Sequence, residues 1–458
     1  MDTMRDRKRL LAVAFAAASM LAGLSARAEG CGRSDVFEMA DGMYFHVSSG
    51  LKAPACPQLA RLLEAGPTPI VEEAPAPQPA PEIPPAPPSS AYPMRDAVGR
   101  ARTMLQARIK ELNDGKKPEI VSSYDIWVDI TLAVWNEKTG EIRLIEAKKS
   151  GFKIDAPVPV SVKRNNGVNS EFILDDPEDI AVGVRYPIFK DVTVTKRKPR
   201  YELHDVVYAP YSKRLHAPET VAWGRETLDA DVKEAYDAYR AAGIRSRAFP
   251  DRLLVDVIKP EQLEAIAIIE HLSEGSLLGS NARSVMESVY VVLGANQDDA
   301  YAYSRSSMGA KGIFQFIPST YKLMAARKEL GLDPDFESGM AHPVNAIKAA
   351  VAYLDAELAG MPLAVKDLYY VNNDRVIEYL AAAYNGGGTR IRRAVKMWGD
   401  AWSEPHAAEI AALSKKKGSR SLAVTQMKNA TLRDETISYV KKLRQTLVLL
   451  RPSPLAGL

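Results

Sequence analysis

This chain of 458 residues has only two cysteines, and it has no large excess of basic over acidic residues. Its two cysteines have no adjacent pair of histidines, so they do not supply the four or so nitrogen and sulfur ligands of a structural zinc site. Its 60 basic and 57 acidic residues leave a net charge of +3, which gives little electrostatic attraction for a polyanion. Neither a metal site nor a nucleic-acid ligand is therefore expected.

Long apolar runs are also missing, apart from one near the N-terminus. Residues 10–24 are apolar, follow a basic stretch at residues 5–9, and precede the small-residue pattern Ala26-Arg27-Ala28. The run of about 15 residues is shorter than the roughly 20 that span a bilayer. It predicts a signal peptide over residues 1–28 and export to the periplasm. An uncleaved N-terminal anchor is the alternative.

Both cysteines, Cys31 and Cys56, follow this segment closely. An oxidising compartment would let them pair, which predicts a small disulfide-stapled module over residues 29–66. A lipoprotein in which Cys31 is acylated is the alternative.

A proline-rich segment comes next. Eleven of the 27 residues at 67–93 are proline. Proline fixes φ and removes a backbone donor, so such a tract favours extended polyproline II. We expect a semi-rigid linker here.

A mixed, β-containing domain is predicted over residues 94–220. Residues 94–113 have apolar side chains at helical spacing, and residues 126–134 alternate as in a strand that enters a hairpin turn at 136–140. Further strand-like segments are VPVSV, EFIL, VTV and VVY. No acid pair, nucleophile elbow or phosphate loop occurs in this region. We expect it to bind or dock a partner protein of the cell envelope.

From about residue 220 the pattern becomes helical. A connecting helical segment is predicted at 221–258 and an all-α domain at 259–451. Glu287 lies on one expected helix among valines, where burial would raise the pKa of a carboxyl group.

Four sequence blocks follow one another in this part of the chain, and each by itself is a weak signal. They are Glu287-Ser288, the string S-x-x-G-A-x-G-x-x-Q-x-x-P-x-T from Ser306 to Thr320, the run A-Y-N-G-G that holds Tyr384 and Asn385, and E-T-x-x-Y-V from Glu435 to Val440. In this order they resemble the soluble lytic transglycosylases, whose catalytic domain has a goose-lysozyme-like fold and cleaves peptidoglycan glycan strands. The resemblance covers under half of the chain.

The resemblance implies a multidomain protein whose C-terminal, all-α, lysozyme-like domain is the enzyme and needs no cofactor. Glu287 would protonate the glycosidic oxygen and then, as carboxylate, take a proton from the muramoyl C6 hydroxyl, so that a 1,6-anhydro ring closes. Ser306 and Gln315 would bind the sugar, Tyr384 would lie near the acid, and Asn385 would shape the groove. Glu435 is similar to another groove residue of the family.

Three alternatives stay open. The connection between Glu287 and Ser306 is longer than is usual in the family, so Glu270 and Glu274 are further candidates for the acid. The same connection contains Asp298 and Asp299, one of which would activate water in a lysozyme-like hydrolase. In the third alternative the domain binds peptidoglycan without cleaving it and serves as an envelope scaffold.

Overall fold

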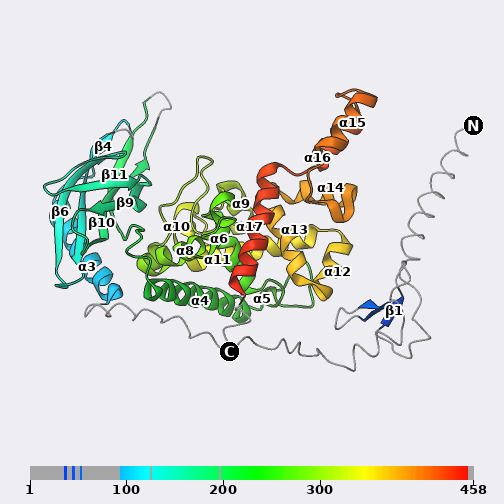
Figure 1. Ribbon diagram of the computed structural model, residues 1–458, viewed down its shortest axis with the longest axis horizontal. Coiled ribbons are helices and arrows are strands. Elements are labelled where there is room, and N and C mark those ends of the chain that lie inside the picture. The colour runs from blue at the N-terminus through cyan, green and yellow to red at the C-terminus, as the bar shows by residue number, and fades with distance from the viewer. Residues whose placement is uncertain are drawn as a thin grey trace, which may run out of the picture. The chain divides into compact units, whose positions relative to one another are not determined.

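The computed structural model describes residues 36–38, 44–46, 52–53, 93–123, 126–194 and 198–451 (Figure 1). The chain divides into two compact units, Met1–Pro88 and Ser89–Leu458. In the first unit, β1 (Val36–Glu38), β2 (Tyr44–His46) and β3 (Lys52–Ala53) form a small antiparallel sheet in that order. The predicted signal peptide, both cysteines and residues 67–92 of the predicted linker lie outside the described residues.

The second unit begins with a helix packed on a sheet. Helix α3 (Met94–Asn113) buries an apolar stripe of Met94, Ala97, Val98, Ala101 and Leu105 and packs on β10. Gly183 of β10 permits a close approach, because a Cβ atom there would lie 2.8 Å from Leu105 Cδ1. The six strands are antiparallel, in the order β4-β11-β10-β5-β6-β7. Their bounds are β4 Ile120–Val121, β5 Val128–Asn136, β6 Ile142–Ser150, β7 Lys153–Asp155, β10 Asp179–Asp191 and β11 Tyr201–Tyr208. A separate hairpin joins β8 (Val160–Arg164) and β9 (Glu171–Leu174).

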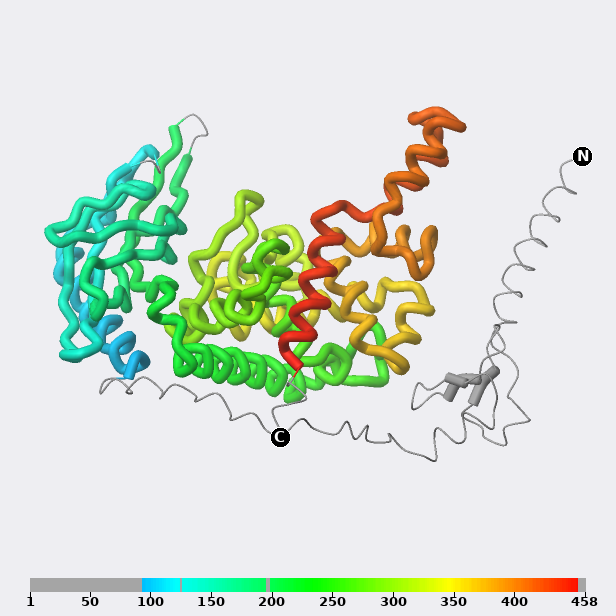
Figure 2. Tube along the Cα trace, viewed as in Figure 1, coloured from blue at the N-terminus to red at the C-terminus, as the bar shows by residue number. Residues whose placement is uncertain are grey.

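A helical region follows, as the colours along the tube in Figure 2 show. Its helices are α4 Pro218–Ala241, α5 Leu254–Val257, α6 Pro260–Glu270, α7 Glu274–Leu277, α8 Ala282–Asn296, α9 Pro318–Ala325, α10 Phe336–Ala341, α11 Pro343–Gly360, α12 Leu363–Val371, α13 Asn373–Gly386, α14 Gly388–Trp398, α15 Ala407–Lys417, α16 Leu422–Ala430 and α17 Asp434–Leu450. Apolar α11 is largely buried and packs on α4, α5, α6, α9, α10 and α13. Helix α17 packs on α6 and α13, and thereby brings the end of the helical region against its beginning (Figure 1).

The helices α4 and α8 cross at very short distance. A Cβ atom on Gly224 of α4 would lie 1.8 Å from the Tyr290 carbonyl oxygen of α8, and one on Gly294 would lie 2.8 Å from Gly224 N. Only glycine leaves room for backbones this close. The crossing fixes the long helix α4 against the rest of the helical region.

Polar contacts, buried at Asn296 and partly exposed at Arg102, join the β-rich and helical regions. Asn296, at the end of α8, is fully buried; its Oδ1 accepts a hydrogen bond from Ala209 N at 2.7 Å and its Nδ2 donates to Ala209 O at 2.9 Å. Arg102 of α3 donates to Asp299 Oδ2 at 2.6 Å. The sheet is therefore attached to the helices through both α3 and the segment after β11.

The expected architecture, a β-containing region followed by an all-α lysozyme-like region, is confirmed. The helix expected at 94–113 is α3, and the expected hairpin joins β5 to β6. The VTV segment at residues 192–194 is not a strand: β10 ends at Asp191, whose Oδ1 accepts a hydrogen bond from Thr193 N, although Val192 N still donates to Arg200 O at 2.9 Å. None of the helices in the described ranges is long and apolar enough to cross a membrane.

Candidate active site

A half-buried glutamate ends helix α6. Glu270 follows the apolar run of this helix, and its Oε1 accepts a hydrogen bond of 2.6 Å from the hydroxyl group of Tyr439 on α17. The ring of Tyr439 is itself buried. Packing of α17 on α6 therefore holds this carboxyl group in one place.

The surroundings of Glu270 favour its protonated form. Burial raises the pKa of Glu270 to about 7, while the Tyr439 hydrogen bond and the positive charge of Lys442 lower it and the charge of Glu435 raises it. Burial dominates because a carboxylate loses more solvation than a neutral carboxyl group. A carboxyl group with a pKa near neutrality both gives and takes a proton readily, as general acid–base catalysis requires.

Residues 304–316 form a compact loop stiffened by its own hydrogen bonds. Gln315 has a left-handed backbone, with φ of 46°, and its Nε2 donates to Gly312 O at 2.8 Å and to Ser304 Oγ at 3.2 Å. Ser306 is exposed, and its Oγ accepts from Ala310 N at 3.0 Å. Since Gln315 is not a glycine, its φ costs conformational energy that the surrounding contacts must offset.

Two hydrogen bonds tie this loop to the neighbourhood of Glu270. His271, the next residue, donates from Nε2 to Ile313 O at 2.9 Å, and burial lowers its pKa to about 4, so the ring is neutral. Tyr384 of α13 donates to Phe314 O at 2.7 Å. The pKa of Tyr384 is raised by burial and by the nearby charge of Glu270. The loop, Tyr384 and Glu270 thus belong to one cluster.

Asn385 and Glu435 lie at the edge of this cluster. Asn385 Oδ1 accepts a hydrogen bond of 2.9 Å from Thr436 Oγ1, which joins α13 to the start of α17. Glu435 is exposed and near enough to Glu270 to raise its pKa. Neither residue contacts the loop through a described hydrogen bond.

The comparison with known protein families concerns this part of the chain. Residues 297–404 match the family model of the transglycosylase SLT domain. The chain contains a transglycosylase SLT domain. The match spans the Gln315 loop and Tyr384, whereas Glu270 precedes it and Tyr439 follows it. None of the curated proteins compared with the chain matches it.

The SLT domain supports the soluble lytic transglycosylase resemblance and indicates lytic transglycosylase activity on peptidoglycan. A lyase that acts on glycan strands is the enzyme class that this family implies. Within the described residues, no group of three or more histidine, cysteine, aspartate or glutamate side chains is placed to hold a metal ion.

Glu287 lies on α8, upstream of the matched SLT domain and in a different setting. About a quarter of its side chain is exposed, and its Oε2 lies 3.6 Å from His216 Nε2, while His216 Nδ1 lies 3.0 Å from the Tyr211 hydroxyl group. In the part of the chain that the structure describes, no hydrogen bond or ion pair joins Glu287 to Gln315 or Tyr384. The catalytic role expected for Glu287 stays a prediction, and the geometry favours Glu270.

The sequence predicts Glu270 only as an alternative to Glu287 and predicts no role for Tyr439. The signal for Tyr439 was present, because it is the tyrosine of the E-T-x-x-Y-V block. Its contact with Glu270 joins residues 169 positions apart, which a local pattern does not reveal.

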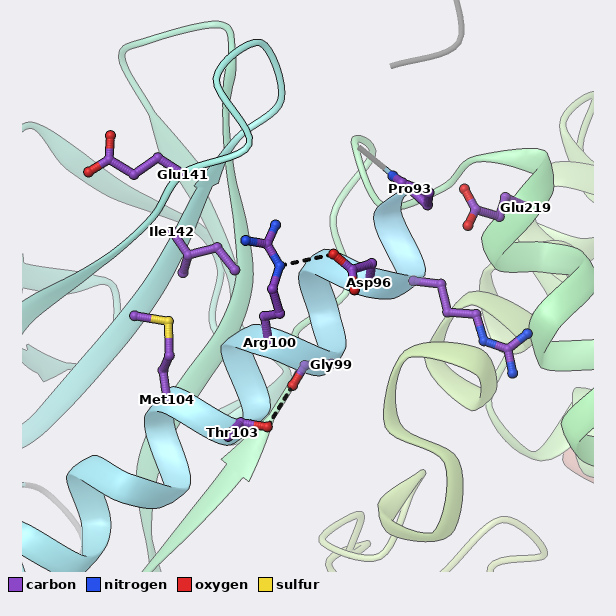
Figure 3. A pocket seen from close by; sticks show the side chains of 10 residues that line it. Pro93, Asp96, Gly99, Arg100, Thr103, Met104, Glu141, Ile142 and Glu219 are labelled. Atoms are coloured by element: carbon purple, nitrogen blue, oxygen red, sulfur yellow. Dashed lines mark hydrogen bonds and ion pairs between the residues drawn. The ribbon is translucent and has the colours of Figure 1, made fainter. Parts of the chain in front are cut away.

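A cavity of about 930 Å³ lies elsewhere, between α3, the start of β6 and the start of α4 (Figure 3). Charged side chains of both signs line it, among them Arg95, Arg100 and Glu219. Arg100 is held by an ion pair of 2.9 Å with Asp96. None of the residues considered above for catalysis lines this cavity.

Proposed function

We propose that the chain cleaves the β-1,4 bond between N-acetylmuramic acid and N-acetylglucosamine in peptidoglycan without water, with Glu270 as both acid and base. The observation that carries the proposal is the position of Glu270. Its carboxyl group has a pKa of about 7, receives the Tyr439 hydrogen bond, and lies beside the loop and the tyrosine of the SLT domain.

One carboxyl group is sufficient for this reaction. Protonated Glu270 gives its proton to the glycosidic oxygen, which leaves as the hydroxyl group of N-acetylglucosamine. The resulting carboxylate then takes the proton of the muramoyl C6 hydroxyl group, whose oxygen attacks C1 and closes a 1,6-anhydro ring. Ordinary glycosidases need a second carboxylate as nucleophile or to activate water. Here the substrate provides the nucleophile, and the proton returns to Glu270.

The neighbouring groups support both halves of this cycle. Tyr439 donates a hydrogen bond to Glu270 and so stabilises the carboxylate that forms after the first proton transfer. Gln315 and Ser306 would hydrogen-bond the sugar from the loop, while Asn385 and Glu435 would line the groove. Gln315 Nε2 already donates hydrogen bonds within the loop, so we expect Gln315 Oε1 to accept a hydrogen bond from the substrate.

The hydrolase alternative depends on Asp298 or Asp299. Asp299 is paired with Arg102 and lies 3.5 Å from the Tyr303 hydroxyl group, at the contact between the helical and β-rich regions. Asp298 lies close enough to Asp231 to raise the pKa of that residue. No described contact connects either aspartate to Glu270. Nothing in the geometry favours an aspartate that activates water beside Glu270.

The test compares Glu270→Gln with Glu287→Gln in the purified protein on isolated peptidoglycan. We expect Glu270→Gln to lower the rate by a factor of about 100 or more, because a general acid is lost. Glu287→Gln should retain activity. Mass spectrometry of the products should show anhydromuramoyl ends, whereas a hydrolase leaves reducing ends. Full activity of Glu270→Gln would refute the assignment, and an inactive wild-type protein would favour a binding scaffold.

The proposed substrate lies in the cell envelope, and we propose that the chain acts in the periplasm. The basis is the pattern of residues 1–28, which lies outside the described part of the chain. Fractionation of cells and N-terminal sequencing of the protein would test this. An intact N-terminus in the cytoplasm would refute it.

A further inference from the structure

Lys442 donates hydrogen bonds to backbone carbonyl groups on both sides of Glu270, the proposed catalytic residue. Its Nζ donates to Ile269 O at 2.6 Å and to Leu272 O at 2.8 Å, one residue before and two residues after Glu270. The last carbonyl groups of a helix lack partners within the helix, and basic side chains commonly bind them. Lys442 therefore caps the C-terminal end of α6 from α17.

The same ammonium group is part of the Tyr439 contact. Lys442 Nζ lies 5.2 Å from the centre of the Tyr439 ring, and the hydroxyl group of that ring donates to Glu270. Tyr439 and Lys442 are three residues apart on α17, so they share a face of that helix. One face of α17 thus contacts the Glu270 carboxyl group and the backbone that carries it.

We propose that Lys442 is a positioning residue for Glu270, which fixes the end of α6 and places a positive charge beside its carboxyl group. This inference rests on the proposed function. In the cycle described above, that charge favours the carboxylate formed once Glu270 has given up its proton.

The charged and titratable groups around Glu270 are few in the described residues. Helix α17 presents Glu435, Tyr439 and Lys442, and α13 presents Tyr384. Lys442 is the positive charge among them, and it also faces Glu274 of α7. Removing this charge leaves burial and Glu435 to raise the pKa of Glu270 without the opposing effect of a cation.

The experiment measures kcat/KM against pH for the wild-type protein, Lys442→Gln, Lys442→Arg and Lys441→Gln. Lys441→Gln is the matched control, because it removes the same charge from the adjacent position on α17, where Lys441 lies 3.5 Å from Glu274. The rate should fall on the alkaline side as Glu270 loses its proton. We expect Lys442→Gln to raise the pH at which this alkaline fall in kcat/KM occurs by on the order of one unit. Lys442→Arg and Lys441→Gln should leave it near the wild-type position.

A second readout needs no activity. The ¹³C NMR titration of the Glu270 carboxyl group, assigned by its loss in Glu270→Gln, should show the same upward shift in Lys442→Gln. An unmoved carboxyl titration in a Lys442→Gln protein that melts like the wild type overturns the inference. An equal shift in Lys441→Gln overturns it as well. Should Glu270→Gln stay active, the proposed function fails, while the titration still decides whether Lys442 acts on Glu270.

Discussion

At the scale of single residues, the protonation of Glu270 is set by groups distant in the sequence. Burial raises its pKa, whereas Tyr439 and Lys442, which lower it, come from α17. Glu270 is also the last residue of α6 and is only partly buried, whereas the apolar residues before it are fully buried. The same residue is therefore both desolvated and accessible.

This arrangement costs stability at high pH. The pKa of Glu270 is about 7 in the folded protein against an ordinary 4.5, so the unfolded chain holds fewer protons between these values and stability falls as pH rises through them. We expect Glu270→Gln to be more stable than the wild type by on the order of 2 kcal/mol at pH 8, and equal to it at pH 4.5. Urea unfolding at both pH values measures this.

The exposed Glu435→Gln variant is the comparison: it removes a neighbouring charge that raises the pKa of Glu270, so it should weaken the pH dependence of stability without abolishing it. A stability difference for Glu270→Gln that is the same at pH 4.5 and pH 8 would contradict the assigned pKa.

Local sequence does not distinguish Glu270 from Glu287 as the catalytic acid. Both glutamates lie on helices with apolar neighbours, and the serine after Glu287 completes a family-like pair. What distinguishes them is a tertiary contact: Tyr439 for Glu270, and His216 for Glu287. By contrast, the Gln315 loop and Tyr384 could be recognised from sequence, because their glycine and small-residue spacing is local.

At the scale of elements, glycine decides how closely helices pack. The crossing of α4 and α8 depends on Gly224, where a Cβ atom would lie 1.8 Å from a carbonyl oxygen that cannot move without shifting α8. We expect Gly224→Ala to destabilise the protein by about 2–4 kcal/mol through overpacking. Thermal unfolding followed by circular dichroism measures this.

Gly99→Ala in α3 is the matched control. Its Cβ atom would meet nothing within 4 Å, so we expect a gain of about 0.5–1 kcal/mol from helix propensity alone. Equal effects of the two substitutions would show that the crossing is looser than described.

Periodicity predicted the elements well where side chains alternate regularly. Both ends of α3 agree with the prediction, because the apolar stripe begins after Pro93 and ends before Asp114-Gly115. The VTV prediction was wrong: β-branched residues favour strands, yet here the Asp191 side chain, not a neighbouring strand, accepts the hydrogen bond of Thr193 N. Such side-chain turns depend on one hydrogen bond that a propensity does not register.

At the scale of the whole second unit, a buried asparagine is one of the contacts that attach the β-rich region to the helices. Replacing Asn296 by alanine leaves the Ala209 N–H and C=O groups without these partners. We expect a loss of about 2–3 kcal/mol and faster proteolysis within residues 209–217. Limited trypsin digestion, followed by mass spectrometry of the fragments, checks this. Asn281→Ala is the control, because Asn281 is exposed and makes no capping bond.

If Asn296→Ala is digested no faster than Asn281→Ala, the attachment does not depend on this side chain. The sequence predicted the two regions separately and could not predict their attachment, since Asn296 looks like any polar residue at the end of a helix. The role of the β-rich region as a docking site for an envelope partner stays a prediction.

Helix α17 packs on α6, so the groups that contact Glu270 and its backbone come from a segment that is synthesised much later than Glu270 itself. A growing polypeptide already displays Glu270 long before residues 434–450 exist, and during that interval the carboxyl group has neither Tyr439 nor Lys442 beside it. In a fragment that ends before α17, Glu270 would therefore lack the hydroxyl donor and the cation that lie beside it in the folded unit.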